Sequence, residues 1–551
     1  MKTVVPPGAT GLTLARHQLP AGAAKAWWRA YRHHLRLVRG GWLAWTIVLA
    51  GIGSGVIATF EDRYATEADL AAFAAFEDVA SFQVLTGRYV QVDTVEGFTL
   101  SRWGMFAIGV AVWGMLTGVG LVRGSEDDGH VEPLRSGLIT ARGLLLAALA
   151  AMLTGHVAFA AAIFLSHAAV GLDAATAWAL GAAMGLLATA FAAAAALASQ
   201  VGATRQRAMA LAAAVFGLAL VLRLVAAAGA TPAWTWWTTP FGWIGFLHEV
   251  DGARAQVIGA LIALSVALLV PALVLARRDL HDGLITAGSG GRRKARPVRA
   301  HAALARHLAA GPTAAWSTMA LPLAFVLGMQ TGDFAAVVDQ IPATAAFLEP
   351  LGMVGLTTPE GFLALSFTVF IALLLALFAA SQVAAIREEE ASWRLEHLLV
   401  RPTGRVDWLL TRTATAAVAV AVIALAAAVA AWLGASFTAT TLTFGDTILA
   451  ALNVLPLAWL FLGLGVGLVG VAPRLSASLA YGLVVAAFLI DFVGSFVGLP
   501  ETALELSPFR HLAAVPFVAI PVGTSLLLLM IGLLGTALGA LGFRRRDLQE
   551  A

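Results

Sequence analysis

The feature that most limits how this chain can fold is a series of long apolar stretches that recurs along its whole length. There are twelve such runs, at residues 42–60, 103–122, 144–170, 174–198, 208–228, 255–276, 315–331, 362–385, 413–434, 447–470, 478–497 and 521–541. A helix of roughly 20 apolar residues is long enough to cross the hydrocarbon core of a bilayer. Because the sequence has no alternating strand pattern, we expect a helical bundle.

Composition supports the same class. The chain is 60% hydrophobic, whereas soluble domains are roughly 45–50% apolar. It has no cysteine, which excludes disulfides and thiolate metal sites, and we expect no metal in this chain. A formal net charge of +3 gives no argument for a nucleic-acid partner. The sequence therefore predicts an all-α polytopic membrane protein.

The distribution of charge predicts how the chain is oriented. Basic residues and no acidic residue precede the first apolar run: Lys2, Arg16, Lys25, Arg29, Arg32, Arg36 and Arg39. The segment after this run is rich in acids instead. The positive-inside rule then places the N-terminus in the cytoplasm, and twelve spans bring the C-terminus to the same side.

The N-terminal basic segment carries a second prediction. Residues 23–39 contain Trp27 and Trp28 among the arginines, which is typical of an amphipathic helix lying on the inner leaflet among membrane lipids. We expect no cleavable signal peptide, because the first apolar run is full length and lacks a small-residue cleavage site.

The chain also repeats itself. DTVEGF at 93–98 recurs as TTPEGF at 357–362, and RGSEDDGHVEPL at 123–134 aligns with REEEASWRLEHL at 387–398, both at an offset of 264. TPF at 239–241 matches SPF at 507–509, and RRDL at 277–280 matches 545–548, both at an offset of 268. Four landmarks in one order predict two parallel repeats of six transmembrane helices.

These matches set the expected boundaries. The first half covers residues 1–276, with an external loop at 61–101 and a cytoplasmic loop at 123–142. A cytoplasmic linker follows at 277–297, and the second half covers 298–551, with corresponding loops at 332–358 and 386–412. Before the second half's charged loop, Thr358 is expected to cap a helix that begins at Pro359.

Residues 386–405, IREEEASWRLEHLLVRPTGR, concentrate charge between two apolar runs in a chain that is only 12% charged. Leu395, Leu398 and Leu399 would share one face of a short helix. The remaining faces would carry Glu389, Glu390, Arg394 and Glu396. This pattern favours a docking surface for a soluble partner, and its recurrence at 123–142 strengthens that interpretation. A solvated connecting loop is the alternative.

The pattern Arg-x-Glu-Glu, Glu-x-Leu-Leu, Pro-x-x-Arg after the second span of a six-span unit resembles the permeases of type-two ATP-binding-cassette (ABC) exporters. Two fused halves in 551 residues resemble most the actinobacterial tetronasin-type permeases that export drugs and polyketide antibiotics. The resemblance implies a bacterial plasma-membrane exporter of hydrophobic or amphiphilic compounds, such as antibiotics, drugs or lipids. It also implies coupling helices on two copies of a cytoplasmic ATP-binding subunit, which would hold ATP and Mg.

The resemblance further implies which residues contact that subunit. They are Arg123, Glu126, Glu132 and Arg142 in the first half, and Arg387, Glu389, Glu390, Glu396 and Arg405 in the second, with Leu398 on the apolar face. The first copy departs from the pattern, because Ser125 stands where a glutamate is expected and Pro133 requires the helix to kink or to begin there.

No ATPase motif is expected in the chain itself. Its lysines are Lys2, Lys25 and Lys294, and none lies in a Gly-x-x-x-x-Gly-Lys-Ser/Thr phosphate loop. The chain is thus predicted to be a transport subunit without enzymatic activity, and any ATP hydrolysis has to occur in a partner.

Two charged residues lie deep in apolar runs at corresponding places of the two halves, Arg223 and Asp491. Charges at this depth are costly and are usually paired or functional. We hypothesise that they form an ion pair between the halves; the alternative is that each pairs with other groups.

Two other functions fit twelve spans. A proton-coupled drug transporter of the major facilitator type also has two six-span halves, but it usually carries coupling carboxylates inside the bundle, where Asp491 stands alone. A membrane-embedded enzyme needs clustered His, Asp or Glu at one membrane face, which the sequence does not indicate.

Overall fold

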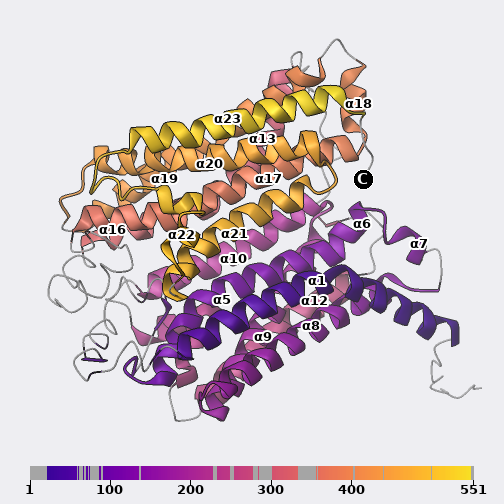
Figure 1. The fold of residues 1–551 in the computed structure, drawn as a ribbon. Helices are drawn as coiled ribbons and strands as arrows, with labels where there is room; N and C mark the ends of the chain where they lie inside the picture. Colours follow the sequence, from indigo (N-terminus) through magenta and orange to yellow (C-terminus); the bar gives the residue numbers. More distant parts are fainter. Residues whose placement is uncertain are drawn as a thin grey trace, which may run out of the picture.

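The computed structural model is an all-α polytopic membrane protein (Figure 1). It describes residues 21–276 apart from parts of 59–90 and from 136–137, 228–231 and 249–252, then 283–284, 301–332, 355 and 358–547 apart from 401–403, 439 and 498. Within these ranges, eleven helices are long and apolar enough to cross a membrane. The remaining predicted span, 478–497, lies in α21 (Ser476–Val497).

The first half begins with α1 (Ala21–Ala58) and α5 (Val95–Val119), which continues through the π-helical turn η1 (Gly120–Gly124) into α6 (Ser125–Asp127). The elements that follow are α7 (Glu132–Arg135), α8 (Ala141–Ala169), α9 (Ala174–Val201), α10 (Arg205–Ala227), η2 (Ala233–Thr238), α11 (Pro240–Trp243), η3 (Ile244–His248) and α12 (Ala253–Leu275).

The second half has a similar order, but its π-helical turn lies earlier in the second span. Its elements are α13 (His301–Met329), α16 (Pro359–Ser366), the π-helical turn η5 (Phe367–Ile371), α17 (Ala372–Ala391), α18 (Arg394–Leu399), α19 (Arg405–Ala435), α20 (Phe444–Val471), α21, α22 (Glu501–Leu504), η6 (Pro508–His511) and α23 (Val522–Arg545). Much of the predicted external loops at 61–101 and 332–358, and nearly all of the linker at 277–297, lie outside the described residues.

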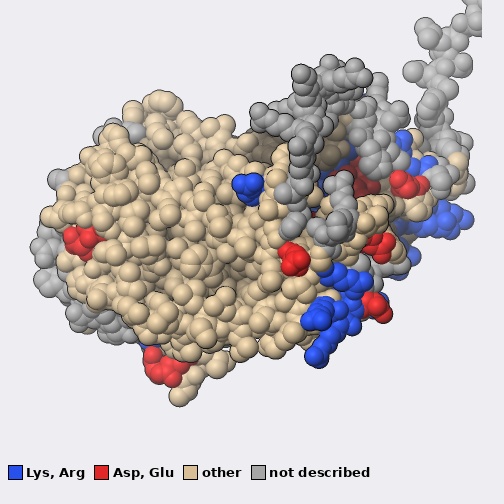
Figure 2. Space-filling model, turned by 90° about the horizontal axis from the view of Figure 1, so that it is seen from above, with Lys and Arg blue, Asp and Glu red and all other residues tan. Residues whose placement is uncertain are grey.

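Each half has its own apolar core, and the halves lie side by side, the first in purple and the second in orange and yellow (Figure 1). α10 and α13 are in contact between them, and Met319 and Val326 of α13 pack against the core of the first half. The elements α6, α7 and α18 lie at the same end of the bundle. We name it the charged end, because Lys, Arg, Asp and Glu gather there in Figure 2.

Matched hydrogen bonds place the two halves in the same register. Thr94 and Thr358 each accept a hydrogen bond from a glycine N–H, that of Gly97 and that of Gly361, at 3.1 Å in both cases. The prediction that Thr358 caps a helix starting at Pro359 is therefore confirmed.

A second matched pair comes from the TPF and SPF landmarks. The Thr239 hydroxyl donates to the carbonyl of Ala219, and the Ser507 hydroxyl donates to that of Ala487, each at 2.7 Å. Donors and acceptors are both 268 residues apart, as the repeat predicts. This buried bond fastens the segment before the sixth span to the fifth span of each half.

One element differs from expectation. The predicted interfacial helix at 23–39 and the first span form a single helix, α1. Gly40 and Gly41 lie at the junction, but the junction has no proline, so the ladder of backbone hydrogen bonds can continue through it. Near its start, Trp27 and Tyr31 of α1 pack against a cluster that includes Val131 and Ile139. The N-terminal part of α1 therefore covers the loop between the second and third spans.

Candidate functional site

The second charged turn, residues 387–399, is built differently from the predicted single helix. α17 continues to Ala391, the chain reverses at Trp393 with φ 63°, and α18 starts at Arg394. Glu389 and Glu390 therefore belong to the end of a span, where they are buried. Leu395 is fully buried and Leu398 packs against the core of its half. The expected leucine face is thus directed into the protein, because it covers the ends of the spans.

Buried ion pairs hold this turn. Glu389 accepts from Arg412 of α19 at 2.7 Å, and Glu390 accepts from Arg546, just beyond α23, at 2.7 Å. The Arg387 guanidinium lies 3.3 Å from the same Glu390 carboxylate. Removing one partner of a buried ion pair is costly, because the other charge stays desolvated. The turn is therefore fixed to two other helices of its half.

Other side chains of the second charged turn face outward. Glu396 and Arg394 are exposed, and Trp393 is 48% exposed. Arg405, at the start of α19, is exposed too and donates to the backbone carbonyl of Arg546 at 3.2 Å. A bulky residue with positive φ is strained by about 1–3 kcal/mol, and such strain is concentrated at functional sites.

The first charged turn, residues 123–135, reverses the chain at the matching position. Gly129, with φ 73°, stands 264 residues before Trp393 and reverses the chain in the same left-handed conformation. Val131 is buried as its counterpart Leu395 is. Glu132 is exposed, and α7 begins at this residue, which confirms that a helix starts at Pro133 or next to it.

Different side chains hold the first turn. Arg123 is fully buried, pairs with Glu126 at 2.7 Å and donates to the Ser199 carbonyl at 2.8 Å. The carboxylate of Asp127 accepts from the backbone N–H of Arg205 at 2.7 Å. Further along, Arg142 donates to the Leu273 carbonyl at 3.0 Å and so ties α8 to α12.

The predicted contact residues fall into three groups, of which the half-buried one comprises Glu126, Arg142 and Leu398. Arg123, Arg387, Glu389 and Glu390 are buried and hold the turns in place, so in this conformation they offer no surface to a partner. Exposed positions are Glu132, Glu396 and Arg405. The predicted role of each group in partner binding stays a prediction.

Sequence reasoning missed Arg412 and Arg546, which complete the network of the second turn. Both carried a signal. Arg412 is a single charge directly before the apolar run 413–434, and Arg546 belongs to the repeated RRDL landmark. By the offset of 268, the counterpart of Arg546 is Arg278, which lies outside the described residues.

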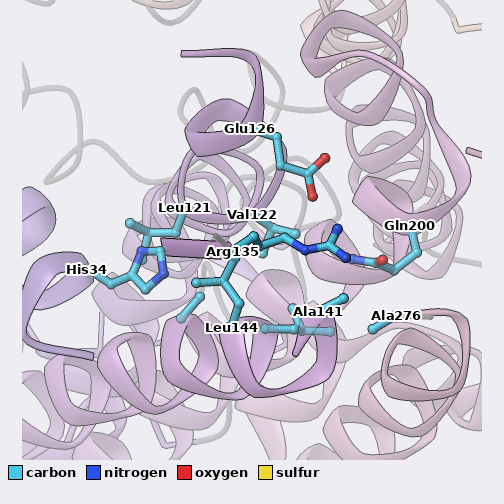
Figure 3. A pocket seen from close by; sticks show the side chains of 11 residues that line it. His34, Leu121, Val122, Glu126, Arg135, Ala141, Leu144, Gln200 and Ala276 are labelled. Carbon is cyan, nitrogen blue, oxygen red and sulfur yellow. The ribbon is translucent and has the colours of Figure 1, made fainter. Parts of the chain in front are cut away.

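A pocket at the charged end was also missed. It lies beside the first charged turn and is lined by residues from α1, η1, α6, α7, α8 and α9, together with Ala276 (Figure 3). Its polar residues are His34, Glu126, Arg135 and Gln200. The Arg135 side chain crosses the pocket between His34 and Gln200 in Figure 3. Because six separate elements meet here, no local pattern in the sequence indicated it.

The intramembrane charges lie in their expected spans. Arg223 of α10 is fully buried, donates to the Gly104 carbonyl at 2.8 Å and lies 6.0 Å from the Phe241 ring centroid. These contacts belong to the first half. The ion pair with Asp491 across the halves stays a prediction.

No group of three or more His, Cys, Asp or Glu side chains among the described residues could hold a metal ion. The site offers buried ion pairs, exposed charges and one aromatic residue with a positive φ.

Comparison with known proteins agrees with this architecture. Residues 299–544 match a family model described as the C-terminal domain of the multidrug efflux system permease Rv1217c. Over 541 residues the chain is 31% identical to the multidrug efflux system permease protein Rv1217c of Mycobacterium tuberculosis, and the match covers 94% of each chain. An identity of this size over nearly the full length of both proteins shows common descent, so the chain belongs to the family of the multidrug efflux permease Rv1217c.

Proposed function

We propose that this chain is the transmembrane subunit of an ATP-driven exporter of hydrophobic or amphiphilic compounds. In this proposal the charged end faces the bacterial cytoplasm, and two copies of a separate ATP-binding-cassette subunit dock there, one on each charged turn. The name of the relative supports the transport of drugs, and the basic residues before the first span support the orientation.

The observation that carries the proposal is the equivalence of the two charged turns. Both reverse the chain at a left-handed residue in the same register, Gly129 and Trp393, and both bury an apolar residue two positions later. Both then expose a glutamate, Glu132 and Glu396. Two like surfaces at one end of a pseudo-symmetric bundle suit two copies of one partner.

Energy has to come from that partner. None of the three lysines of the chain lies in a phosphate-binding loop, so ATP and Mg would be bound and ATP hydrolysed in the docked subunits. The buried ion pairs supply the mechanical link. Because Glu389 and Glu390 join the second turn to α19 and to the end of α23, a displacement of the turn moves these helices together, as rigid-body transitions require.

The experiment is purification of the tagged chain from its native membrane in mild detergent. We expect a stoichiometric ATP-binding subunit to co-purify, and to be lost when Glu132→Arg and Glu396→Arg are combined, because both exposed surfaces then change sign.

The matched control combines Asp93→Arg and Glu505→Arg. These residues are also exposed, one in each half, and they lie outside both charged turns. The control should keep the subunit. A chain that purifies alone and still moves drugs in vesicles driven by a proton gradient would contradict the proposal.

A further inference from the structure

The pocket beside the first charged turn combines polar groups with an apolar wall. Leu121, Leu144 and Leu145 line it together with His34, Glu126 and Arg135. Its cavity volume is about 30 Å³, and the pocket opens to solvent, so it has room for a small polar head while the rest of a ligand would lie at its mouth. A ligand here would place a polar head against charged groups and an apolar portion against the leucines.

Two of the polar groups have no partner within the described structure. His34 is 1% exposed, and neither of its ring nitrogens has a hydrogen-bond partner there. Arg135 is half-buried, and its guanidinium has no hydrogen bond or ion pair with a described residue. A buried polar group without a partner is costly, so His34 points to a ligand that completes it, and the half-buried Arg135 lines the same pocket.

The charged groups that line the pocket indicate the charge of that ligand. The only carboxylate lining the pocket, Glu126, is engaged by the buried guanidinium of Arg123 at 2.7 Å. The neutral Gln200 amide also lines the pocket, and the ionisable groups left to bind a ligand are therefore a guanidinium and an imidazole, which can both donate hydrogen bonds. An arginine fork matches the oxygens of a phosphate or carboxylate geometrically. An anion therefore fits the pocket better than a cation.

The surroundings define the rest of the ligand. Along α1, on which His34 lies, Trp28 is 48% exposed, the Arg32 guanidinium lies 5.5 Å from the Trp28 ring centroid, and Arg29 and Arg36 are exposed. Exposed aromatic and basic residues along one helix are typical of protein in contact with the headgroups of anionic lipids. The pocket lies at the same end of the bundle, which faces the inner leaflet in the orientation proposed above.

We propose that this pocket binds the phosphate head of an anionic amphiphile, with Arg135 and His34 donating to the phosphate oxygens and the acyl portion lying on Leu144 and Leu145. The ligand in this proposal is a membrane phospholipid, and the experiment separates it from a free phosphate with no tail. The site is independent of the energy source proposed above.

The second half lacks the corresponding site. The residue equivalent to Arg135 is Leu399, 264 positions later, and it packs against the core. The residue equivalent to Glu126 is Glu390, whose carboxylate accepts a hydrogen bond from Arg546. We therefore expect one ligand for each chain.

The test measures thermal unfolding of the purified full chain in an uncharged detergent. Dihexanoylphosphatidylglycerol, dihexanoylphosphatidylcholine and inorganic phosphate are titrated separately at constant ionic strength, since a ligand that binds the folded state raises the unfolding temperature. The variants are Arg135→Gln, Arg135→Lys and, as the matched control, Arg394→Gln, which removes an exposed arginine from the second charged turn.

We expect saturable stabilisation by phosphatidylglycerol, with an apparent Kd weakened about tenfold or more in Arg135→Gln, less in Arg135→Lys, and unchanged in Arg394→Gln. Because Arg135 makes no contact that holds the fold, its variants should remain folded. Equal binding by Arg135→Gln, or an equal loss in Arg394→Gln, would overturn the proposal. Inorganic phosphate binding as tightly as phosphatidylglycerol would also overturn it, since the tail would then contribute nothing.

Discussion

The first charged turn, residues 123–135, and the second, residues 387–399, reverse the chain at matching positions but are held by different side chains. In both, a guanidinium caps the end of the fourth span of its half by donating to a carbonyl. Arg123 donates to Ser199 in the first half, and Arg546 donates to Val469 in the second. These two acceptors are 270 residues apart and match in register, because α9 and α20 are both 28 residues long. Both halves thus place a guanidinium at this carbonyl, but the arginine that supplies it comes from a different helix end in each half.

The second turn has an additional ion pair that the first lacks. Glu389 and Arg412 are 2.7 Å apart, and their sequence counterparts are Ser125 and Leu149. Both members are replaced together, so neither half contains a lone buried charge at this place. The absence of a glutamate at Ser125 is therefore matched by the absence of its arginine partner at Leu149.

The largest expected effect comes from removing one member of the Glu389–Arg412 ion pair while the other stays buried. Arg412→Leu should destabilise the chain by about 3–5 kcal/mol, because Glu389 stays buried without its cation. The double variant Glu389→Ser with Arg412→Leu copies the arrangement of the first half and should recover most of the loss. Unfolding temperature in detergent and the amount of chain in the membrane check this. A double variant no better than the single one would break the comparison.

The next prediction concerns helix packing near the turns. Gly470 of α20 lies against the backbone of Gly539 of α23, where a Cβ would collide. The first half has Gln200 and Pro271 at the equivalent positions, and Gln200 lines the pocket. Gly470→Leu should cost about 1–3 kcal/mol through overpacking, whereas Gln200→Leu should change stability little. Thermal unfolding of both variants measures the contrast, and equal losses would contradict it.

A third prediction compares the left-handed residues. Trp393→Gly relieves backbone strain but raises the entropy of the unfolded chain, so stability should hardly change. If Trp393 anchors the proposed ATP-binding subunit, its affinity should fall about tenfold, or about 1.4 kcal/mol. Titration of the purified subunit measures this. Retained affinity would leave the strain at Trp393 without a docking role, and Gly129→Ala serves as a purely conformational control.

The smallest effect is expected at the helix caps opposite the turns. α20 starts with a capping box in which Thr443 and Asp446 exchange hydrogen bonds, and Asp173 is the N-cap of α9. Thr443→Ala should cost about 1 kcal/mol, measured by thermal unfolding.

Asp173→Ala should lower the free energy of unfolding only at a pH above the pKa of the Asp173 carboxyl. The hydrogen bond from the Thr176 N–H lowers the pKa of Asp173 below its usual value of 3.8. A lowered pKa stabilises the fold above the unfolded-state pKa, and this contribution is lost as pH falls through the folded-state pKa. The difference between Asp173→Ala and the unchanged chain should therefore disappear in acid. A difference independent of pH would contradict the role of the carboxylate.

Much of the fold could be predicted from the sequence, because its strongest signals are local. An apolar run has to be helical in a bilayer whatever its neighbours are, and Thr358 caps its helix through a bond to Gly361, only three residues away. Repeated landmarks such as TPF and SPF then matched the halves, because the same short segments carry the same buried hydrogen bonds.

The candidate site was harder to predict, because its contacts join distant residues. Periodicity placed Glu389 and Glu390 on a solvated helix, whereas their partners lie 23 and 156 residues later, at Arg412 and Arg546. Charge in a short polar segment is normally exposed, and only the tertiary structure supplies the cations that allow its burial. The pocket around Arg135 depends in the same way on six elements that meet only in the folded chain.

The length of α1 has a mechanical consequence. Its 38 residues extend about 57 Å at 1.5 Å per residue, about twice the hydrocarbon thickness of a bilayer of roughly 30 Å. The part nearest the N-terminus lies on the first charged turn through Trp27 and Tyr31. Part of α1 therefore extends beyond the hydrocarbon core of a bilayer, and this extension supports the first charged turn from outside the core. The first helix of the second half, α13, has 29 residues and leaves a shorter extension.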